Sequence, residues 1–284
     1  MIHAELLTAT LNLIALLALV TAGFNLVYGV LGFLNIAHSE VVVLGALLTY
    51  KLSGVMSFPA AVLLGILLTS TAGLIVGRVL FSPLRLFPKN AMLATSLGLA
   101  LVLQVCYTAM TRQASVSLRP EPTVFRFISV DYQSTWFLLV ITLLAVGSLQ
   151  LWLQRTKLGQ SLRAISENLT LAEAWGLPVS LAYDVVFSIS FALAGIAGAF
   201  VALHYSTSFG FAFKILIWSF SAMLVGGLGR LTGGLIACVP ISFAWVILER
   251  LGVEPYVDSL LLFLCACFYL AFPEGILGRR LRIV

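Results

Sequence analysis

Charged residues are scarce along the whole chain. Only 10% of the 284 residues are Asp, Glu, Lys or Arg, whereas 61% are hydrophobic. A soluble domain carries about 25% charged residues, so this composition excludes an ordinary soluble fold. A helix needs roughly 20 predominantly apolar residues to cross a bilayer, and several charge-free stretches reach that length. The sequence therefore predicts an all-α protein that crosses a membrane several times.

The chain also lacks the short motifs of common enzymes and metal sites. It contains no GxxxxGK phosphate loop, no GxSxG, no HExxH and no CxxC pattern. Its cysteines all lie within apolar runs, where a small buried side chain is the usual interpretation: Cys106, Cys238, Cys265 and Cys267. We therefore expect no catalytic residue, no metal site and no cofactor bound by this chain.

The basic residues are few, but their positions are informative. They concentrate at residues 78–89, 155–163 and 279–282, and the first of these loops contains no acidic residue. Loops rich in Lys and Arg stay on the cytoplasmic side of a membrane, so we place all three there. The expected partners of these charges are lipid headgroups rather than nucleic acid. Counting the apolar runs gives about eight or nine transmembrane segments, with an external N-terminus if there are nine.

The chain reads as a single membrane domain over residues 1–284 with two long polar interruptions. The first, residues 112–135, contains Pro120 and Pro122, which break a helix, and we expect a polar external loop there. The second, residues 154–184, is placed in the cytoplasm by its basic residues and is the expected coupling region.

Short helices are expected within residues 154–184. Apolar residues recur there at near-helical spacing: Leu162, Ile165, Leu169, Ala172 and Trp175. This spacing predicts one amphipathic helix face. Thr170 and Glu173 match a capping box at a helix start, and Gly176 gives a stop signal. A solvated connecting loop is the alternative that the pattern leaves open.

Residues 23–50 contain a glycine-punctuated break between two apolar runs. Ahead of the break, four residues lie three, four and seven positions apart and so share one helix face: Asn25, Tyr28, Gly29 and Gly32. Such a face suits a tight contact between helices, across which an Asn side chain can hydrogen-bond. Lining a transport pathway is the other interpretation.

Several polar residues follow directly after this break. Asn35 is placed to cap a second helix that begins at Ile36, and Glu40 would lie near the positive end of its dipole. His38 and Glu40 are two residues apart, so their side chains cannot both face one partner. The spacing therefore argues against a catalytic His–Glu pair.

A second glycine-rich break lies nearer the C-terminal end. Residues 226–234 read GGLGRLTGG and separate two short apolar halves. We hypothesise that residues 28–48 and 223–242 form an internal repeat of interrupted helices. In transporters, pairs of interrupted segments in two halves point to a pathway at their interface.

Four stretches of the chain together resemble a known family. They are residues 23–46 (GFNLVYGVLGFLNIAHSEVVVLGA), 94–104 (ATSLGLALVLQ), 155–177 (RTKLGQSLRAISENLTLAEAWGL) and 220–239 (FSAMLVGGLGRLTGGLIACV) with 270–278 (LAFPEGILG). They resemble LivH-type permease subunits of branched-chain amino-acid ABC importers, a family that also includes urea and short-amide permeases. The first and third stretches are the more specific. Ser39 is a departure, because the family usually shows Gly there.

The resemblance implies a multi-pass permease in a bacterial cytoplasmic (inner) membrane with several partners. These would be a second homologous, LivM-like permease, two ATP-binding subunits that hydrolyse the ATP, and an extracytoplasmic substrate-binding protein. The translocation pathway would be lined or shaped by Asn25, Tyr28, Asn35, His38 and Glu40. Coupling to the ATPases would involve Gly159, Arg163, Ala164, Glu167 and Gly176.

Alternative functions stay open at this point. Within the resemblance, the substrate is a branched-chain or related amino acid, or else urea or a short amide. Outside it, the polar break would be the substrate or ion site of a self-sufficient secondary carrier or channel. Such carriers more often show several intramembrane acids, whereas Glu40 is nearly isolated here. This favours a chain that is driven by a separate subunit.

Overall fold

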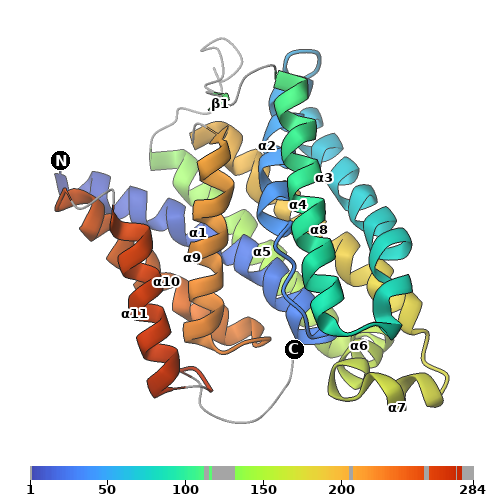
Figure 1. The fold of residues 1–284 in the computed structure, drawn as a ribbon. Helices are drawn as coiled ribbons and strands as arrows, with labels where there is room; N and C mark the ends of the chain where they lie inside the picture. The colour runs from blue at the N-terminus through green and yellow to red at the C-terminus, as the bar shows by residue number, and fades with distance from the viewer. Residues whose placement is uncertain are drawn as a thin grey trace.

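The fold is almost entirely helical, as Figure 1 shows. This structure, a computed structural model, describes residues 2–111, 115–116, 132–204, 207–252, 256–272 and 274–276. Within these residues, six helical segments are long and apolar enough to cross a membrane: Leu6–Leu31, Phe58–Leu86, Lys89–Thr111, Thr135–Arg155, Val179–Leu203 and Leu231–Arg250. Two shorter apolar helices accompany them, at Gly210–Gly226 and Val257–Ala271. The predicted all-α membrane fold is confirmed.

The helices and the two short strands follow a simple order along the chain. They are α1 (Ile2–Leu31), α2 (His38–Ser53), α3 (Phe58–Ile75), the π-helix η1 (Val76–Phe81), the 3₁₀-helix η2 (Pro83–Leu86), α4 (Lys89–Thr111), β1 (Ser115–Val116), α5 (Tyr132–Arg155), α6 (Lys157–Glu167), α7 (Leu169–Ala174), α8 (Val179–His204), β2 (Thr207–Ser208), α9 (Phe209–Gly226), α10 (Leu231–Arg250) and α11 (Val257–Ala271). The two strands pair antiparallel. Helices dominate because a helix satisfies its own backbone groups inside a bilayer.

Helices α1 and α8 form the centre of the molecule. Both are buried along most of their length, and Leu16, Leu19 and Phe187 are fully enclosed. Helix α2 packs closely on α8, because a Cβ atom added to Gly45 would lie 3.1 Å from the Cα atom of Gly195. Small residues allow two backbones to approach in this way. The absence of a side chain at Gly45 and Gly195 therefore lets α2 and α8 pack tightly.

Helices α3, α4 and α5 lie around this centre and turn apolar side chains outward. Leu67, Leu101 and Leu143 are more than half exposed, at 61%, 55% and 70%. A helix that is hydrophobic on its outer face as well as its inner one belongs in a membrane. These exposed apolar faces suit a membrane environment, and they frame the buried centre.

Two helices carry a charged residue within their first two turns. Helix α9 begins at Phe209 and includes Lys214, whose Nζ atom lies 3.9 Å from Oδ2 of Asp258. Helix α8 begins at Val179, so it takes up the last residues of the predicted connecting region 154–184. Paired or helix-terminal charges are tolerated at the ends of membrane helices, and a plain count of apolar residues misses them.

Two predicted features lie mostly outside the described residues. Of the polar loop expected at residues 112–135, the structure describes β1 and the residues from Tyr132 onward, which already belong to α5. The basic residues 279–282 are not among those described.

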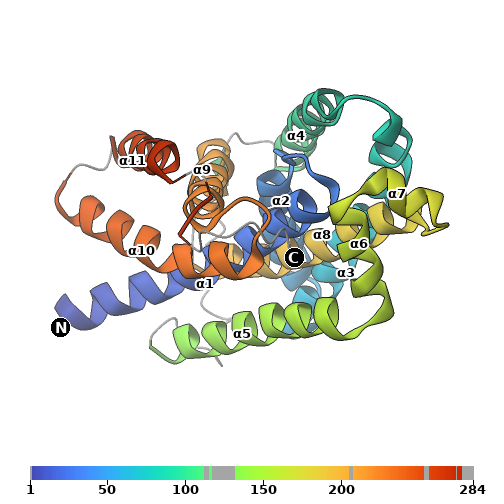
Figure 2. The ribbon, with the colours of Figure 1, turned by 90° about the horizontal axis from the view of Figure 1, so that it is seen from below.

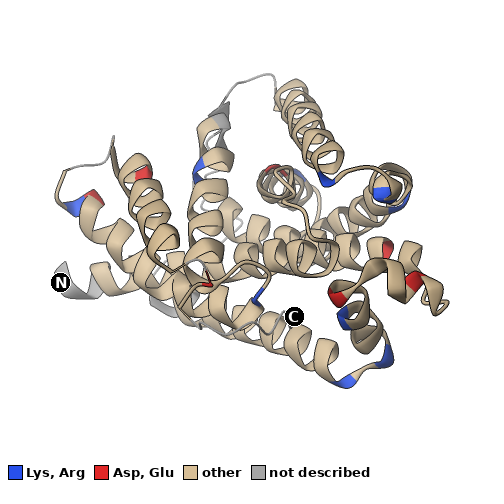
Figure 3. Cartoon of the chain, turned by 60° about the horizontal axis from the view of Figure 1, so that its bottom comes forward, with Lys and Arg blue, Asp and Glu red and all other residues tan. Residues whose placement is uncertain are grey.

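One end of the molecule gathers many of the basic side chains, as Figure 3 shows. Two segments form it: residues 76–89, which contain η1 and η2, and residues 155–178, which contain α6 and α7. We call this end the basic face. Figure 2 views the molecule from this end and shows α6 and α7 beside α8. The charge bias agrees with the cytoplasmic side that the sequence predicts for both segments.

Candidate functional site

Helix α1 ends in a tight turn that only a glycine accommodates well. The N–H of Gly32 donates to the carbonyl oxygen of Tyr28 at 2.9 Å, and Gly32 has φ of +74°. Side chains with a Cβ atom rarely adopt that conformation, whereas glycine does so freely. Residues 32–37 then form a non-helical break before α2 begins at His38.

A serine from α4 holds the backbone of this break. The hydroxyl of Ser96 lies 3.2 Å from the N–H of Ile36, which donates to it, and 3.3 Å from the carbonyl oxygen of Leu34. The hydroxyl of Ser39 donates to the carbonyl oxygen of Ile36 at 3.2 Å. Buried backbone groups need such partners wherever a helix is interrupted. The serine that departs from the family pattern therefore serves the same turn.

The prediction that Asn35 caps α2 is wrong. Helix α2 begins two residues later than predicted, with Ala37 at its N-cap position and no side-chain cap. Ser96 already accepts from the N–H at position 36, so a second acceptor from Asn35 is not needed there. The Asn35 side chain is 1% exposed, and neither of its amide atoms has a hydrogen-bond partner among the described residues.

His38 is enclosed between α1 and α8. Its Nδ1 atom lies 3.1 Å from the hydroxyl of Ser190, and the same hydroxyl donates to the carbonyl oxygen of Gly23 at 3.1 Å. Because that serine proton is used for Gly23, the histidine must be the donor in the first bond. The edge of the ring also packs on Phe24, with 4.7 Å between the ring centres. His38 therefore joins three helices in one buried contact.

Glu40 faces a different helix. Its side chain is 9% exposed, and Oε2 accepts a hydrogen bond from the hydroxyl of Tyr107 in α4 at 3.0 Å. His38 instead faces α1 and α8, so the prediction that the two side chains cannot share a partner is confirmed. A buried carboxylate at this depth is costly unless it is hydrogen-bonded, and the tyrosine supplies that bond.

The break between α9 and α10 lies against the end of α1. Residues 227–230 form it, and Gly229 has φ of +75°. The Oδ1 atom of Asn25 accepts from the N–H of Gly229 at 3.1 Å, which confirms the predicted hydrogen bond across a helix contact. A Cβ atom added to Gly29 would lie 2.9 Å from the carbonyl oxygen of Gly229. The second glycine-rich break therefore touches the last turns of α1, about 200 residues earlier in the sequence and just ahead of the first break.

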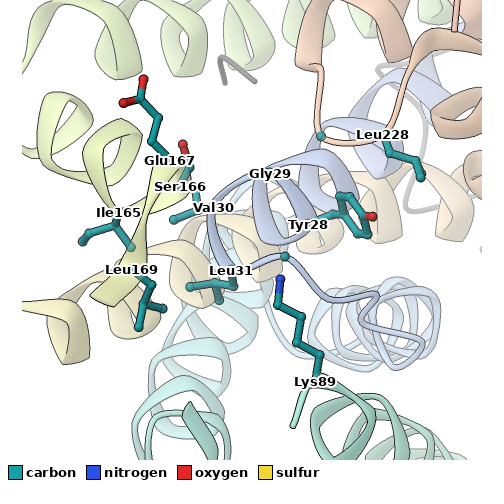
Figure 4. Close-up of a pocket in the computed structure, with 12 residues that line it drawn as sticks. Tyr28, Gly29, Val30, Leu31, Lys89, Ile165, Ser166, Glu167, Leu169 and Leu228 are labelled. Atoms are coloured by element: carbon teal, nitrogen blue, oxygen red, sulfur yellow. The ribbon is translucent and has the colours of Figure 1, made fainter. Parts of the chain in front are cut away.

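A cavity of about 360 Å³ opens at this meeting point, on the basic face (Figure 4). Its lining combines the end of α1, the turn after α9, the junction of α6 with α7 and the start of α4: Tyr28, Gly29, Val30, Leu31, Gly32, Lys89, Ile165, Ser166, Glu167, Leu169, Leu228 and Gly229. Figure 4 shows Lys89 reaching toward the end of α1 and Glu167 pointing away from it. Both polar and apolar groups thus border one space of ligand size.

Residues 155–178 form the two short helices that the sequence predicts between membrane helices. Thr156 caps α6 by accepting from the N–H of Gly159 at 3.1 Å, and Asn168 caps α7 by accepting from the N–H of Leu171 at 3.0 Å. The capping box predicted at Thr170 and Glu173 is therefore wrong. The polar residue two positions earlier starts the helix, because the break between α6 and α7 falls at Asn168.

The buried face of α6 and α7 is largely the predicted one. Leu162, Ile165 and Ala172 are buried, but Trp175 is 80% exposed, so its assignment to that face is wrong. Helix α7 ends at Ala174, one residue before Trp175, and the helical spacing no longer applies beyond that point. The exposed Trp175 and the half-exposed Leu171 instead add apolar surface to the basic face.

The predicted coupling residues fall in two classes. Gly159 is buried, and a Cβ atom there would collide with the backbone of Leu153 in α5. The guanidinium of Arg163 donates to the carbonyl oxygen of Gln154 at 3.4 Å. The others lie exposed on the basic face: Ala164, Glu167 and Gly176. Gly159 and Arg163 thus fix α6 against α5, and the three exposed residues are free to meet a partner.

The sequence did not single out several residues that build this region. Ser190 holds His38, Lys89 borders the cavity, and Arg85 pairs with Glu173 at 3.2 Å between Nη2 and Oε1. Their partners lie far away in sequence, so spacing gives no signal for them. The one sequence signal is that the basic loop containing Arg85 has no acidic residue, so an acidic partner of Arg85 must come from another part of the chain.

Known sequences match the chain over most of its length. The profile of the branched-chain amino acid transport system permease component matches residues 6–270. The high-affinity branched-chain amino acid transport system permease protein BraD of Pseudomonas aeruginosa is 27% identical, over 92% of this chain and 91% of BraD. The corresponding protein LivH of Escherichia coli is 25% identical over the same shares. A probable LivH of Methanocaldococcus jannaschii is 30% identical over 79% of this chain and 73% of its own length. No solved structure matches the chain.

Proposed function

The chain belongs to the family of branched-chain amino acid transport system permease components, and we propose on this basis that it forms half of the membrane pathway of an ATP-driven importer. It is a multi-pass protein of the inner membrane. The relatives named above are permeases for branched-chain amino acids, which favours leucine, isoleucine or valine as substrate over urea or short amides. Adding α2, α9 and α11 to the six long spans gives nine crossings in our proposal.

The observation that supports this proposal most is that the two glycine-rich breaks border one cavity, where the second break lies against the end of α1 just ahead of the first. Interrupted helices that face each other near a pathway are a recurring feature of transporters, because unwound backbone is tolerated only where it is buried or lines a cavity. Here the end of α1 and the turn after α9 share the cavity with α6 and α7. A small change in the breaks would therefore open or close this space on the basic face.

We assign the predicted pathway residues two kinds of role. Tyr28 borders the cavity and would contact a passing substrate. Asn25 and His38 hold the breaks in place through buried hydrogen bonds, and Glu40 does so through Tyr107. Asn35, whose buried amide has no hydrogen-bond partner among the described residues, is the pathway candidate that a moving break would expose first. As a group, the five predicted pathway residues would therefore shape the pathway more than they line it.

The energy source in this proposal is a pair of separate ATP-binding subunits. They would dock on α6 and α7, the part of the basic face that presents exposed side chains between two membrane helices. A second, homologous permease would complete the pathway, and a binding protein would deliver the substrate on the opposite side. This chain would bind no nucleotide itself, so ATP hydrolysis would belong to its partners.

Co-purification and uptake together test this function. We expect the tagged chain to retain ATP-binding subunits in mild detergent and to support ATP-dependent uptake of a branched-chain amino acid. Reversing the charge of Arg163 in α6 with Arg163→Glu should reduce both. Arg78→Glu makes the same change in an exposed residue of the basic face outside α6 and α7, and it should leave both near the wild-type level.

A self-sufficient carrier would give the opposite results. Uptake by the purified chain alone in liposomes without ATP would overturn the proposed function. So would unchanged uptake in Arg163→Glu combined with no retained ATPase. Transport of urea or acetamide in place of leucine would correct the substrate and leave the ATP-driven mechanism standing.

A further inference from the structure

Residues 76–89 contact the coupling region and the first glycine break at the same time. We call them the bridge segment. On the side of the coupling region, the guanidinium of Arg85 pairs with Glu173 of α7, with Nη2 and Oε1 3.2 Å apart. The two side chains are 28% and 44% exposed, so water and salt weaken this pair but do not remove it. The bridge segment is thus tied to α7 by an ion pair.

An aromatic stack joins the bridge segment to the break after α1. The ring of Phe81 stacks on Phe33, which lies in that break, with 5.2 Å between ring centres and 24° between planes. It also stacks on Phe187 of α8 at 4.6 Å and 17°. All three rings are buried, at 3% exposure or less. Close-packed rings of this kind move together, because gaps between them cost dispersion energy.

A second contact to the same break lies at the other end of the bridge segment. The Nζ atom of Lys89 occupies the space where a Cβ atom of Gly32 would stand. A cation at the C-terminus of a helix complements the partial negative charge of its last carbonyl groups, so Lys89 also stabilises the end of α1. Figure 4 shows the side chain of Lys89 extended in this direction. The break is therefore held at both Phe33 and Gly32.

The bridge segment itself has an unusual backbone. It begins with the π-helix Val76–Phe81, whose wide turn is closed by the N–H of Ser82 donating to the carbonyl oxygen of Gly77 at 2.8 Å. A Cβ atom at Gly77 would lie 2.8 Å from the carbonyl oxygen of Tyr183 in α8. Single π-helical turns are rare and are often found at functional sites. This turn places Phe81 and Arg85 toward different partners within a few residues.

We propose that the bridge segment transmits the movement of α6 and α7 to the α1–α2 break, and that Arg85, Phe81 and Lys89 are positioning residues for transport. This inference rests on the proposed function, in which the ATP-binding subunits move α6 and α7. Displacing α7 would pull Arg85 through Glu173, and the stacked rings and Lys89 would carry that displacement to the end of α1. The cavity beside Gly32 would change shape as a result.

Helix α6 offers a competing route, because it also packs directly on α1 and α5. If that route alone acted, the ion pair at Arg85 would have no influence on transport. The two routes can be separated because α6 contributes nothing to the Arg85–Glu173 pair, and because charges can be exchanged in that pair without altering α6.

A charge exchange in the assembled transporter tests the bridge segment. The complete complex in proteoliposomes would be assayed for amino-acid uptake and for ATP hydrolysis with Arg85→Glu, Glu173→Arg and the double exchange. We expect each single variant to lower uptake roughly fivefold while ATP hydrolysis falls less than twofold. A loss of this size corresponds to removing an exposed ion pair and replacing it with a repulsion between like charges. The double exchange should restore the uptake per ATP to within about twofold of the wild type.

Two further variants complete the test. Arg78→Glu makes the same charge reversal in the same segment, but Arg78 has no ion pair among the described residues. This variant should therefore keep the wild-type uptake per ATP. Phe81→Leu should lower uptake per ATP without any change in charge. Co-purification of all subunits would show that each variant still assembles.

The outcomes separate the inference from the function on which it rests. Absence of ATP-driven uptake in the wild type would overturn both. With an active wild type, wild-type uptake per ATP in both single variants would overturn the bridge alone. Loss of assembly in the single variants, or an equal loss in Arg78→Glu, would assign Arg85 a purely structural or a general electrostatic role and would overturn it as well.

Discussion

The two glycine-rich breaks look alike in sequence but are held in different ways. The first, residues 32–37, relies on side chains from other helices, with Ser96 bonded to its backbone and Lys89 against its start. The second, residues 227–230, donates one such bond to Asn25 but lies between interlocked helix ends: a Cβ atom on Gly226 of α9 would collide with the backbone of Gly233 in α10. Side-chain contacts can be remade in a new position, whereas interlocked backbones cannot. The first break is therefore the adjustable one, and the second is its fixed support.

The largest effect is expected from filling the second break. Gly226→Ala places a methyl group into the backbone of Gly233, and overpacking of this kind costs about 3 kcal/mol or more. We expect little folded protein in detergent extracts, measured by size-exclusion chromatography. Gly98→Ala is the matched control, because a Cβ atom there meets nothing within 4 Å. Equal yields from the two variants would contradict a fixed second break.

A smaller effect is expected where the second break meets the end of α1. Asn25→Ala removes the acceptor of the Gly229 N–H and leaves a cavity against Gly234. An unpaired buried donor costs about 1–3 kcal/mol, so the melting temperature in detergent should fall clearly. Thr10→Ala, nearer the other end of α1, removes a hydroxyl that donates to the carbonyl oxygen of Leu6 in the same helix, and it should lower the melting temperature less. A larger drop in melting temperature for Thr10→Ala than for Asn25→Ala would show that the contact between Asn25 and Gly229 adds no stability.

Removing a side chain that holds the first break should cost less. Ser96→Ala deprives the Ile36 N–H of its acceptor, at a cost of about 1 kcal/mol. We expect a modest drop in melting temperature together with faster hydrogen exchange at residues 32–37. The neighbouring Thr95→Ala, whose hydroxyl bonds only to Ala91, should leave that exchange unchanged. Exchange that stays slow in Ser96→Ala would mean that other contacts hold the break.

The smallest effect on stability, but a measurable one on transport, is expected at His38. His38→Gln loses the ring contact with Phe24 but keeps a hydrogen-bond donor toward Ser190. Because that donor is kept, the protein should assemble normally. Uptake should fall about threefold to tenfold, which corresponds to roughly 1 kcal/mol in the rate-limiting movement. Ser190→Ala should show a similar loss in the same uptake assay. Failure of His38→Gln to assemble would make the contact structural instead.

Sequence reasoning reached the parts of this fold that depend on local pattern. Membrane helices, the two breaks, the short helices between α5 and α8 and the separate directions of His38 and Glu40 all follow from composition and spacing. The internal repeat stays a prediction: the two breaks line one cavity, but their flanking helices α2 and α10 differ in length, at 16 and 20 residues.

What the sequence could not supply are the partners of each polar group. Asn35 was expected to cap α2, but Ser96, 60 residues further along, takes the N–H of Ile36. Glu173 was expected in a capping box, but it pairs with Arg85. Both errors have the same cause, since a local motif competes with long-range contacts that only the packed helices create. The same limit applies to the cavity, which draws its lining from four separate segments.

The composition of α2 has a consequence for how the protein is made. With 16 residues that include Glu40 and Lys51, α2 is short for a membrane span and carries two charges. The partners of those charges, the Tyr107 hydroxyl and the Met110 carbonyl oxygen, belong to α4 and are synthesised about 60 to 70 residues later. Membrane insertion of α2 must therefore wait for α4, or be held open by the insertion machinery until α4 arrives. Ribosome-bound chains that end before Tyr107 should leave α2 exposed to the aqueous phase, whereas chains long enough for the whole of α4 to have left the ribosome should not.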